Sequence, residues 1–191
     1  MTDRRSEVIA LVREQGYERR EQPFKLASGQ LSHDYVDAKY AVRRGASLRL
    51  AADAILDVAR RLTDGFTAVG GPTMGADALA VAVALAADCT WFFVRKEPKS
   101  RGREQWIEGE RLSGADRVLL VEDVVTTGGS MITAYQRVVE TGATVVAAVA
   151  LVDRGDTAAR RFAELGVPYG AVVTYADLGI DPVAAPAAST A

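Results

Sequence analysis

Residues 117–130, which read RVLLVEDVVTTGGS, constrain the fold more than any other stretch of this 191-residue chain. Residues 118–121 form a short apolar run, as in a buried strand. From Met131 to Val139 apolar side chains recur at helical spacing, which predicts a helix that ends near Gly142. An acidic pair and a glycine-rich turn lie between the two. A strand, an acidic pair, a glycine turn and a helix, in this order, predict an α/β sheet with a ligand site at the carboxyl end of this strand.

The glycine turn has the composition of a phosphate site. Its glycines let several backbone N–H groups converge on one anion, and the following helix adds the partial positive charge of its N-terminus. Thr126, Thr127 and Ser130 can donate hydroxyl hydrogen bonds to the same oxygens. Glu122 and Asp123 can accept hydrogen bonds from sugar hydroxyls or hold a hard cation through water. An ordinary strand–turn–helix junction is the alternative, but the acidic pair beside this turn favours a phosphorylated sugar as ligand.

Composition excludes several classes of protein. The net charge of −2 and the pI of about 5.5 argue against a general nucleic-acid or membrane surface. The longest apolar run, residues 78–87, is too short to span a bilayer. Cys89 is the only cysteine, so no internal disulfide can form, and a cytoplasmic location is expected. His33 is the only histidine and is expected to be a surface or hydrogen-bonded residue, not a metal ligand or a catalytic base.

Strands and helices alternate from about residue 46 onward, which predicts a parallel sheet wound by right-handed crossovers. The expected helices are 6–15, 46–62, one ending at residue 87, one following residue 130, and 156–165; the expected strands are 66–70, 90–95, 118–121, 144–152 and 168–175. We divide the chain into an N-terminal helix and hood (1–42), an α/β core (43–181) and a tail expected to be disordered (182–191).

The hood is a predicted short hairpin within residues 24–39, with its turn near residues 28–30. Polar Tyr35, Asp37 and Lys39 alternate with apolar residues, as they would along a strand with one solvated face. Periodicity favours a solvated edge for this polar face. The alternative is that Lys25, Asp37 and Lys39 face a ligand.

Two loops at strand ends could contact the rest of a phosphorylated ligand. Residues 70–77 join a strand to a helix through Gly, Pro and Thr, so this loop could hold a second anion, although simple loop chemistry explains it equally well. Residues 95–111 form a long basic segment without clear periodicity. It could be a cationic lid over a pyrophosphate or a solvated charged loop. Only four of the 23 basic residues are lysines, and two of these, Lys96 and Lys99, lie in this loop.

A third segment, Asp153-Arg154, follows the most apolar strand. An arginine at that position can present a two-pronged donor to a carboxylate. The alternative is a surface Asp–Arg pair at a turn.

Residues 118–130 resemble the phosphoribosyl pyrophosphate (PRPP) motif of the type I phosphoribosyltransferases. The hood residues Phe24, Ser28-Gly29, Tyr35 and Asp37, together with the basic loop and Arg154, extend the resemblance to the orotate phosphoribosyltransferases. It covers the chain from Phe24 to Asp181. The resemblance implies a type I phosphoribosyltransferase fold, in which helices flank a central, mostly parallel β-sheet and a small N-terminal hood is attached.

The resemblance also implies a reaction in which orotate and PRPP give orotidine 5′-monophosphate and pyrophosphate, with Mg²⁺ as cofactor, in de novo pyrimidine biosynthesis. The implied PRPP-binding residues are Thr73, Arg95, Lys96, Lys99, Arg101, Glu122, Asp123, Val124, Val125, Thr126, Thr127, Gly128, Gly129 and Ser130. The implied orotate-binding residues are Lys25, Thr126 and Arg154. Lys99, Arg101 and Asp123 are implied to be catalytic, with Asp123 contacting Mg²⁺ indirectly, through water or the ribose. The family is dimeric, and Lys99 and Arg101 would act in the partner's site.

Three positions depart from the pattern of that family. Arg101 stands where the family usually has His, Ala27 where many members have Lys, and Thr73-Met74-Gly75 lacks a lysine that some members carry. Two alternative functions therefore stay open: a phosphoribosyltransferase for another base, and a non-catalytic PRPP-sensing regulator. Arg154 suits a carboxylated base, and an intact Lys96/Lys99 pair favours catalysis.

Overall fold

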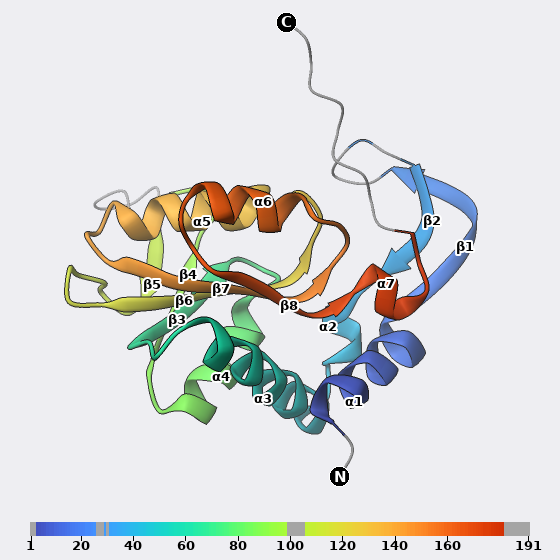
Figure 1. Ribbon diagram of the computed structural model, residues 1–191, viewed down its shortest axis with the longest axis horizontal. Helices are drawn as coiled ribbons and strands as arrows, with labels where there is room; N and C mark the ends of the chain where they lie inside the picture. The colour runs from blue at the N-terminus through green and yellow to red at the C-terminus, as the bar shows by residue number, and fades with distance from the viewer. Residues whose placement is uncertain (1–2, 26–28, 30, 99–105, 182–191) are drawn as a thin grey trace, which may run out of the picture.

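A computed structural model describes residues 3–25, 29, 31–98 and 106–181, and its centre is a six-stranded sheet (Figure 1). The strand order is β5-β4-β3-β6-β7-β8, and all neighbours are parallel except β4 and β5. The strands are β3 (Ala68–Pro72), β4 (Thr90–Val94), β5 (Ile107–Gly109), β6 (Arg117–Val125), β7 (Thr144–Asp153) and β8 (Tyr169–Thr174). The predicted mostly parallel α/β sheet is confirmed.

Helices cover both faces of this sheet, which explains why its central strands are apolar on both sides (Figure 1). One face carries α3 (Gly45–Leu62) and α4 (Asp77–Ala87), and the other carries α5 (Gly129–Val139) and α6 (Thr157–Glu164). β6 lies near the middle of the sheet, so the turn that follows it opens at the centre of the carboxyl edge. Among the helices that the structure describes, none combines the length and apolar character needed to cross a bilayer.

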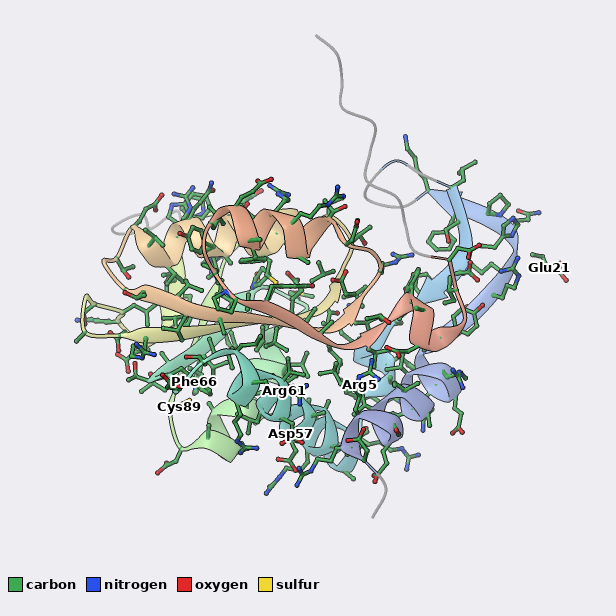
Figure 2. All side chains as sticks on the ribbon, viewed as in Figure 1. Arg5, Glu21, Asp57, Arg61, Phe66 and Cys89 are labelled. Carbon is green, nitrogen blue, oxygen red and sulfur yellow. The ribbon has the colours of Figure 1, made fainter. Side chains whose placement is uncertain are left out.

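The N-terminal part forms a separate two-stranded hairpin beside the β8 end of the sheet (Figure 1). Its elements are α1 (Arg4–Leu11), a π-helical turn η1 (Val12–Gly16), β1 (Tyr17–Lys25), β2 (Leu31–Val36) and α2 (Ala38–Ala41). Arg5 of α1 donates a hydrogen bond to Asp177 of α7 (Tyr175–Leu178) over 2.6 Å, which ties this part to the end of the core (Figure 2).

Three local expectations change. A hairpin is present, but its first strand begins at Tyr17, before the predicted residue 24. Asp37 and Lys39 lie beyond it, because the Asp37 carboxylate accepts from Tyr40 N over 3.0 Å and caps α2. The loop 95–111 contains the short strand β5, which pairs antiparallel with β4. β6 continues through the acidic pair to Val125, so the strand is longer than residues 118–121. The tail 182–191 lies outside the described residues.

Candidate active site

The acidic pair lies inside β6, near its carboxyl end, and both side chains are buried: Glu122 is 8% and Asp123 6% exposed. Burial raises the pKa of Glu122 to about 9, and the neighbouring Asp123 charge adds to this, although Lys96 and Lys39 oppose it. At neutral pH Glu122 is therefore protonated in the ligand-free protein. Its carboxyl group can then donate a hydrogen bond as well as accept one.

Asp123 is held from two sides. Lys39 Nζ lies 3.1 Å from its Oδ2 atom. On the other side, a Cβ atom at Gly75 would stand 2.1 Å from Asp123 Oδ1, so only glycine leaves room for this carboxylate. Burial works against the charge of Lys39, but the Asp123 carboxylate outweighs it and raises the pKa of Lys39. Lys39 is therefore charged at neutral pH.

A cavity of about 940 Å³ opens above the acidic pair at the carboxyl edge of the sheet. It brings together the loop after β3, the start of the basic loop after β4, the acidic pair and the first turn of α5. Its lining comprises Lys39, Thr73, Met74, Gly75, Asp77, Phe93, Arg95, Lys96, Glu97, Glu108, Glu122, Asp123 and Ser130. Of the fourteen residues that the sequence predicts for PRPP binding, Thr73, Arg95, Lys96, Glu122, Asp123 and Ser130 line this one cavity.

The glycine turn has the backbone expected of an anion cradle. Gly128 adopts φ 73°, in the left-handed region that favours glycine, and begins α5 without a side-chain cap. The first N–H groups of α5 therefore have no acceptor within the helix and are oriented toward its N-terminal end. A Cβ at Gly128 would also meet Ala158 Cβ at 3.1 Å. Arg161 Nη1, from α6, donates to the Thr127 carbonyl over 3.1 Å and stabilises the turn.

Arg154 is buried and does not form a surface pair with Asp153. It is 8% exposed, and its Nη2 atom donates to the backbone carbonyl of Asp34 over 3.2 Å. Asp153 instead accepts from Tyr169 OH over 2.8 Å. The Arg154 guanidinium also lies over the Tyr175 ring, 5.1 Å from its centroid, and its buried Nε atom has no hydrogen-bond partner among the described residues. The surface-pair alternative is therefore wrong, and a buried, partly unsatisfied donor faces the hairpin.

The other predicted residues are placed as follows. Arg95 pairs with Glu108 of β5 over 3.2 Å, and its backbone N–H donates to the Trp106 carbonyl over 2.8 Å, which closes the base of the basic loop. Lys99 and Arg101 lie outside the described residues. Lys25 is exposed at the end of β1 and does not line the large cavity. His33 is hydrogen-bonded to the Arg20 carbonyl over 2.9 Å, as expected of a satisfied histidine.

For Lys39 the sequence favoured a solvated hairpin edge and left a ligand-facing position as the alternative; Asp77 was not assigned to the site. The short helix α2 places Lys39 at the cavity, in agreement with that alternative. Asp77 begins α4, and its buried Oδ1 atom has no partner among the described residues. Burial and the Asp123 charge raise the pKa of Asp77. The lysine pattern was the available signal for Lys39, because few lysines occur in this arginine-rich chain.

A divalent cation fits this cavity only together with a ligand that supplies further oxygens. The described residues contain no group of three or more His, Cys, Asp or Glu side chains placed to hold a metal. Asp123, Glu122 and the unpartnered Oδ1 of Asp77 supply some oxygen donors. Mg²⁺ commonly binds through one or two carboxylates, water and substrate phosphates, and this donor set suits that arrangement.

Comparison with known proteins gives a consistent result. The family model described as the phosphoribosyl transferase domain matches residues 42–164. The orotate phosphoribosyltransferase of Pyrococcus abyssi is 39% identical over 155 residues, which cover 81% of this chain and 85% of that protein. The orotate phosphoribosyltransferase of Streptomyces avermitilis is 41% identical over 162 residues, which cover 82% of this chain and 87% of that protein.

Solved structures agree in fold. The Mycobacterium tuberculosis orotate phosphoribosyltransferase in complex with PRPP aligns with a TM-score of 0.77 and 33% identity, over 93% of this chain and 100% of that chain. A phosphoribosyltransferase from Corynebacterium diphtheriae aligns with a TM-score of 0.80 and 33% identity, over 94% of this chain and 100% of that chain.

Proposed function

The chain belongs to the phosphoribosyltransferase family, and from that premise we propose that it is a pentosyltransferase that moves the 5-phosphoribosyl group from PRPP to orotate. The products are orotidine 5′-monophosphate and pyrophosphate, and the reaction belongs to pyrimidine biosynthesis. The observation that carries the proposal is the single cavity in which the acidic pair of β6, the first turn of α5 and the basic residues after β4 meet. The names of the relatives support orotate as the base.

The cavity suits the charges of such a transfer. Breaking the bond between C1 of the ribose and the pyrophosphate builds positive charge on the ribose and negative charge on the leaving group. Asp123 would stabilise the first, and Arg95 and Lys96 the second; all three line the cavity. Thr126, Thr127, Gly128, Gly129 and Ser130, with Val124 and Val125 leading into the turn, would hold the 5′-phosphate. Glu122 and Asp123 would contact the ribose hydroxyls.

The orotate site is proposed between the end of β7 and the hairpin. Arg154 would bind the orotate carboxylate, a role that its buried and partly unsatisfied guanidinium supports. Thr126 and Lys25 would complete the base site. Orotate already carries a nucleophilic nitrogen, so a strong general base is not required, and the hydrogen-bonded His33 has no role in this scheme.

We include Mg²⁺ as the cofactor, held mainly by the substrate and indirectly by Asp123. When bound, it would neutralise the pyrophosphate and stabilise the leaving group. The chain's own contribution would be to orient the ribose through Glu122 and Asp123 and to contact the pyrophosphate through Arg95 and Lys96.

A homodimer is also part of the proposal, with α4 at the interface. Leu85 and Met74 are 81% and 78% exposed, and an almost wholly apolar groove of about 420 Å³ runs between α4, Leu48 and Phe93. Exposed apolar surface of this kind is typical of protein interfaces. Phe93 and Asp77 line both this groove and the large cavity. A partner seated on α4 could therefore supply Lys99 and Arg101 to the neighbouring site.

The cytoplasm is the proposed location, because the single cysteine excludes an internal disulfide and suits a reducing compartment.

A spectrophotometric assay with orotate, PRPP and Mg²⁺ tests the function. The purified protein should consume orotate in a PRPP-dependent manner and leave uracil, hypoxanthine and adenine unchanged. Consumption of another base in place of orotate would favour a transferase of different specificity. PRPP binding by the folded protein without turnover of any base would favour the regulator.

A further inference from the structure

Lys39 reaches the large cavity from outside the sheet. It belongs to α2, which directly follows the N-terminal hairpin, and it lines the same cavity as Thr73 and Gly75. Its side chain is 61% exposed, whereas the side chain of its partner Asp123 is 9% exposed. The Lys39 side chain is therefore accessible to a ligand in the cavity, while its ammonium group lies 3.1 Å from a buried carboxylate oxygen.

Of the two partners, only Lys39 is free to move. Asp123 is fixed in the strand β6 and packed against the Gly75 backbone, where even a methyl group would overlap with it. Lys39 has a flexible four-carbon stem and three N–H donors, and its contact with Asp123 needs only one of these. The cavity's Arg95 is already fixed by its ion pair with Glu108 over 3.2 Å. Lys39 is thus able to change partners without rearrangement of the backbone.

Acidic residues outnumber the three basic residues that line the cavity, Lys39, Arg95 and Lys96, so Lys39 adds to the positive charge available to an anionic ligand. Asp77, Glu97, Glu108, Glu122 and Asp123 all line it. A pyrophosphate group that approached this acidic lining without a nearby cation would be repelled by the ionised carboxylates among them. Lys39 contacts Asp123, the most buried of these side chains, and can shield it.

We propose that Lys39 binds the pyrophosphate group: its ammonium is the counter-ion of Asp123 in the free protein and moves to a pyrophosphate oxygen when the ligand enters, leaving Asp123 free for the ribose. This inference rests on the proposed function and adds a residue from the N-terminal part to it. No covalent bond changes in this step. The ammonium group exchanges one hydrogen-bond acceptor for another.

Binding of pyrophosphate itself, without orotate and without catalysis, tests the inference. Isothermal titration calorimetry with MgCl₂ present should give at least about a tenfold weaker dissociation constant for Lys39→Met, since a charge-assisted hydrogen bond is lost. Lys39→Arg should stay within about threefold of the unchanged protein, because it keeps the charge. Arg44→Met is the matched control: Arg44 is exposed, follows α2 closely and does not line the cavity.

Steady-state kinetics give an independent readout. Lys39→Met should raise KM for PRPP by a similar factor and leave KM for orotate unchanged, with thermal unfolding unchanged within about 2 °C. Pyrophosphate affinity equal to that of the unchanged protein, or a loss shared equally by Arg44→Met, would overturn the inference. If Lys39 only positioned Asp123, kcat would fall while pyrophosphate bound normally, and that result would also overturn it. Because the calorimetry needs no turnover, it separates failure of this inference from failure of orotate to react.

Discussion

Arg154 Nη2 donates a hydrogen bond to the backbone carbonyl of Asp34 over 3.2 Å, and this contact joins the end of β7 to the N-terminal hairpin. Asp34 is itself fixed, since its carboxylate accepts from Tyr17 OH over 2.8 Å and from Arg19 Nη1 over 2.9 Å. The guanidinium is therefore oriented by both the core and the hairpin. An orienting contact on one edge leaves the other donors of the fork available for a carboxylate.

Arg154→Lys should selectively weaken orotate binding. Lysine keeps the charge but loses the planar fork, and the lost charge-assisted hydrogen bond costs about 2 kcal/mol, or roughly a 30-fold rise in KM for orotate. KM for PRPP should stay within about threefold. Arg160→Lys is the control, because Arg160 forms an exposed pair with Asp156 on α6 over 3.0 Å. An equal rise in both KM values would show that Arg154 serves general stability instead.

The contribution of Glu122 to the free energy of unfolding should decrease as pH rises. Its pKa in the folded protein is raised to about 9 by burial, whereas in the unfolded chain it is near 4.5. Its contribution is therefore fully present below about pH 4.5 and is lost progressively up to about pH 9, as the unfolded state releases a proton that the folded state retains. Glu122→Gln removes this titration.

Denaturant unfolding at pH values from 5 to 9 checks the prediction. The difference in unfolding free energy between the unchanged protein and Glu122→Gln should fall with pH by at most about 1.4 kcal/mol per unit. Glu164→Gln, an exposed change on α6, should give a difference that is flat with pH. A flat difference for Glu122→Gln would mean that this carboxyl is ionised in the folded protein.

Gly75→Ala should impair both activity and folding. The added Cβ would stand 2.1 Å from Asp123 Oδ1, so either the loop or the carboxylate must shift. Overpacking of this kind typically costs about 1–3 kcal/mol, and displacement of Asp123 should lower kcat strongly. Gly45→Ala, at the start of α3, is the control because nothing lies within 4 Å of its added Cβ. Thermal unfolding and the orotate assay measure both effects, and full activity of Gly75→Ala would contradict the described position of Asp123.

Lys99→Ala should lower kcat by orders of magnitude while PRPP still binds, if the basic loop stabilises the leaving group. The trans arrangement predicts complementation. When Lys99→Ala subunits are mixed with Asp123→Asn subunits, each inactive alone, a mixed dimer pairs an intact loop with an intact acidic residue in one of its two sites. Partial activity after mixing and refolding is expected. No recovery in verified mixed dimers would mean that each loop serves its own subunit.

Leu85→Glu should dissociate the proposed dimer. This side chain is 81% exposed on the apolar face of α4, and a charge there would be buried without a partner on association. Light scattering should show a monomer with reduced orotate turnover and an unchanged circular dichroism spectrum. Leu165→Glu, at a residue that is 39% exposed beyond the end of α6, should leave the oligomeric state unchanged. A dimer that survives Leu85→Glu would place the interface elsewhere.

The features that depend on local sequence could be predicted, and those that depend on neighbouring segments could not. The apolar run, the glycine at the left-handed position and the helical spacing together determine β6, its turn and α5. β5 has only three residues and forms because β4 offers an open edge, which no local pattern reveals.

The site shows the same division. Lys39 follows the polar alternation of a strand, but the capping side chain of Asp37 starts a helical turn that overrides this pattern. Asp153 and Arg154 are adjacent in sequence, which left a surface pair as the alternative to a carboxylate-binding Arg154. β7 ends at Asp153 and Arg154 follows it, and the two side chains find separate partners, Tyr169 and Asp34.

Asp123 is contacted by Lys39 from the N-terminal part and by the loop before α4, while it is itself part of β6. Three segments that are distant in sequence thus meet at one carboxylate. For protein engineering, this means that the N-terminal hairpin is not an interchangeable module. A chimera that takes residues 1–42 from a relative would change the hairpin that contacts Arg154 and also the charge beside the acidic pair, so the residue at position 39 must be chosen together with those at positions 75 and 123.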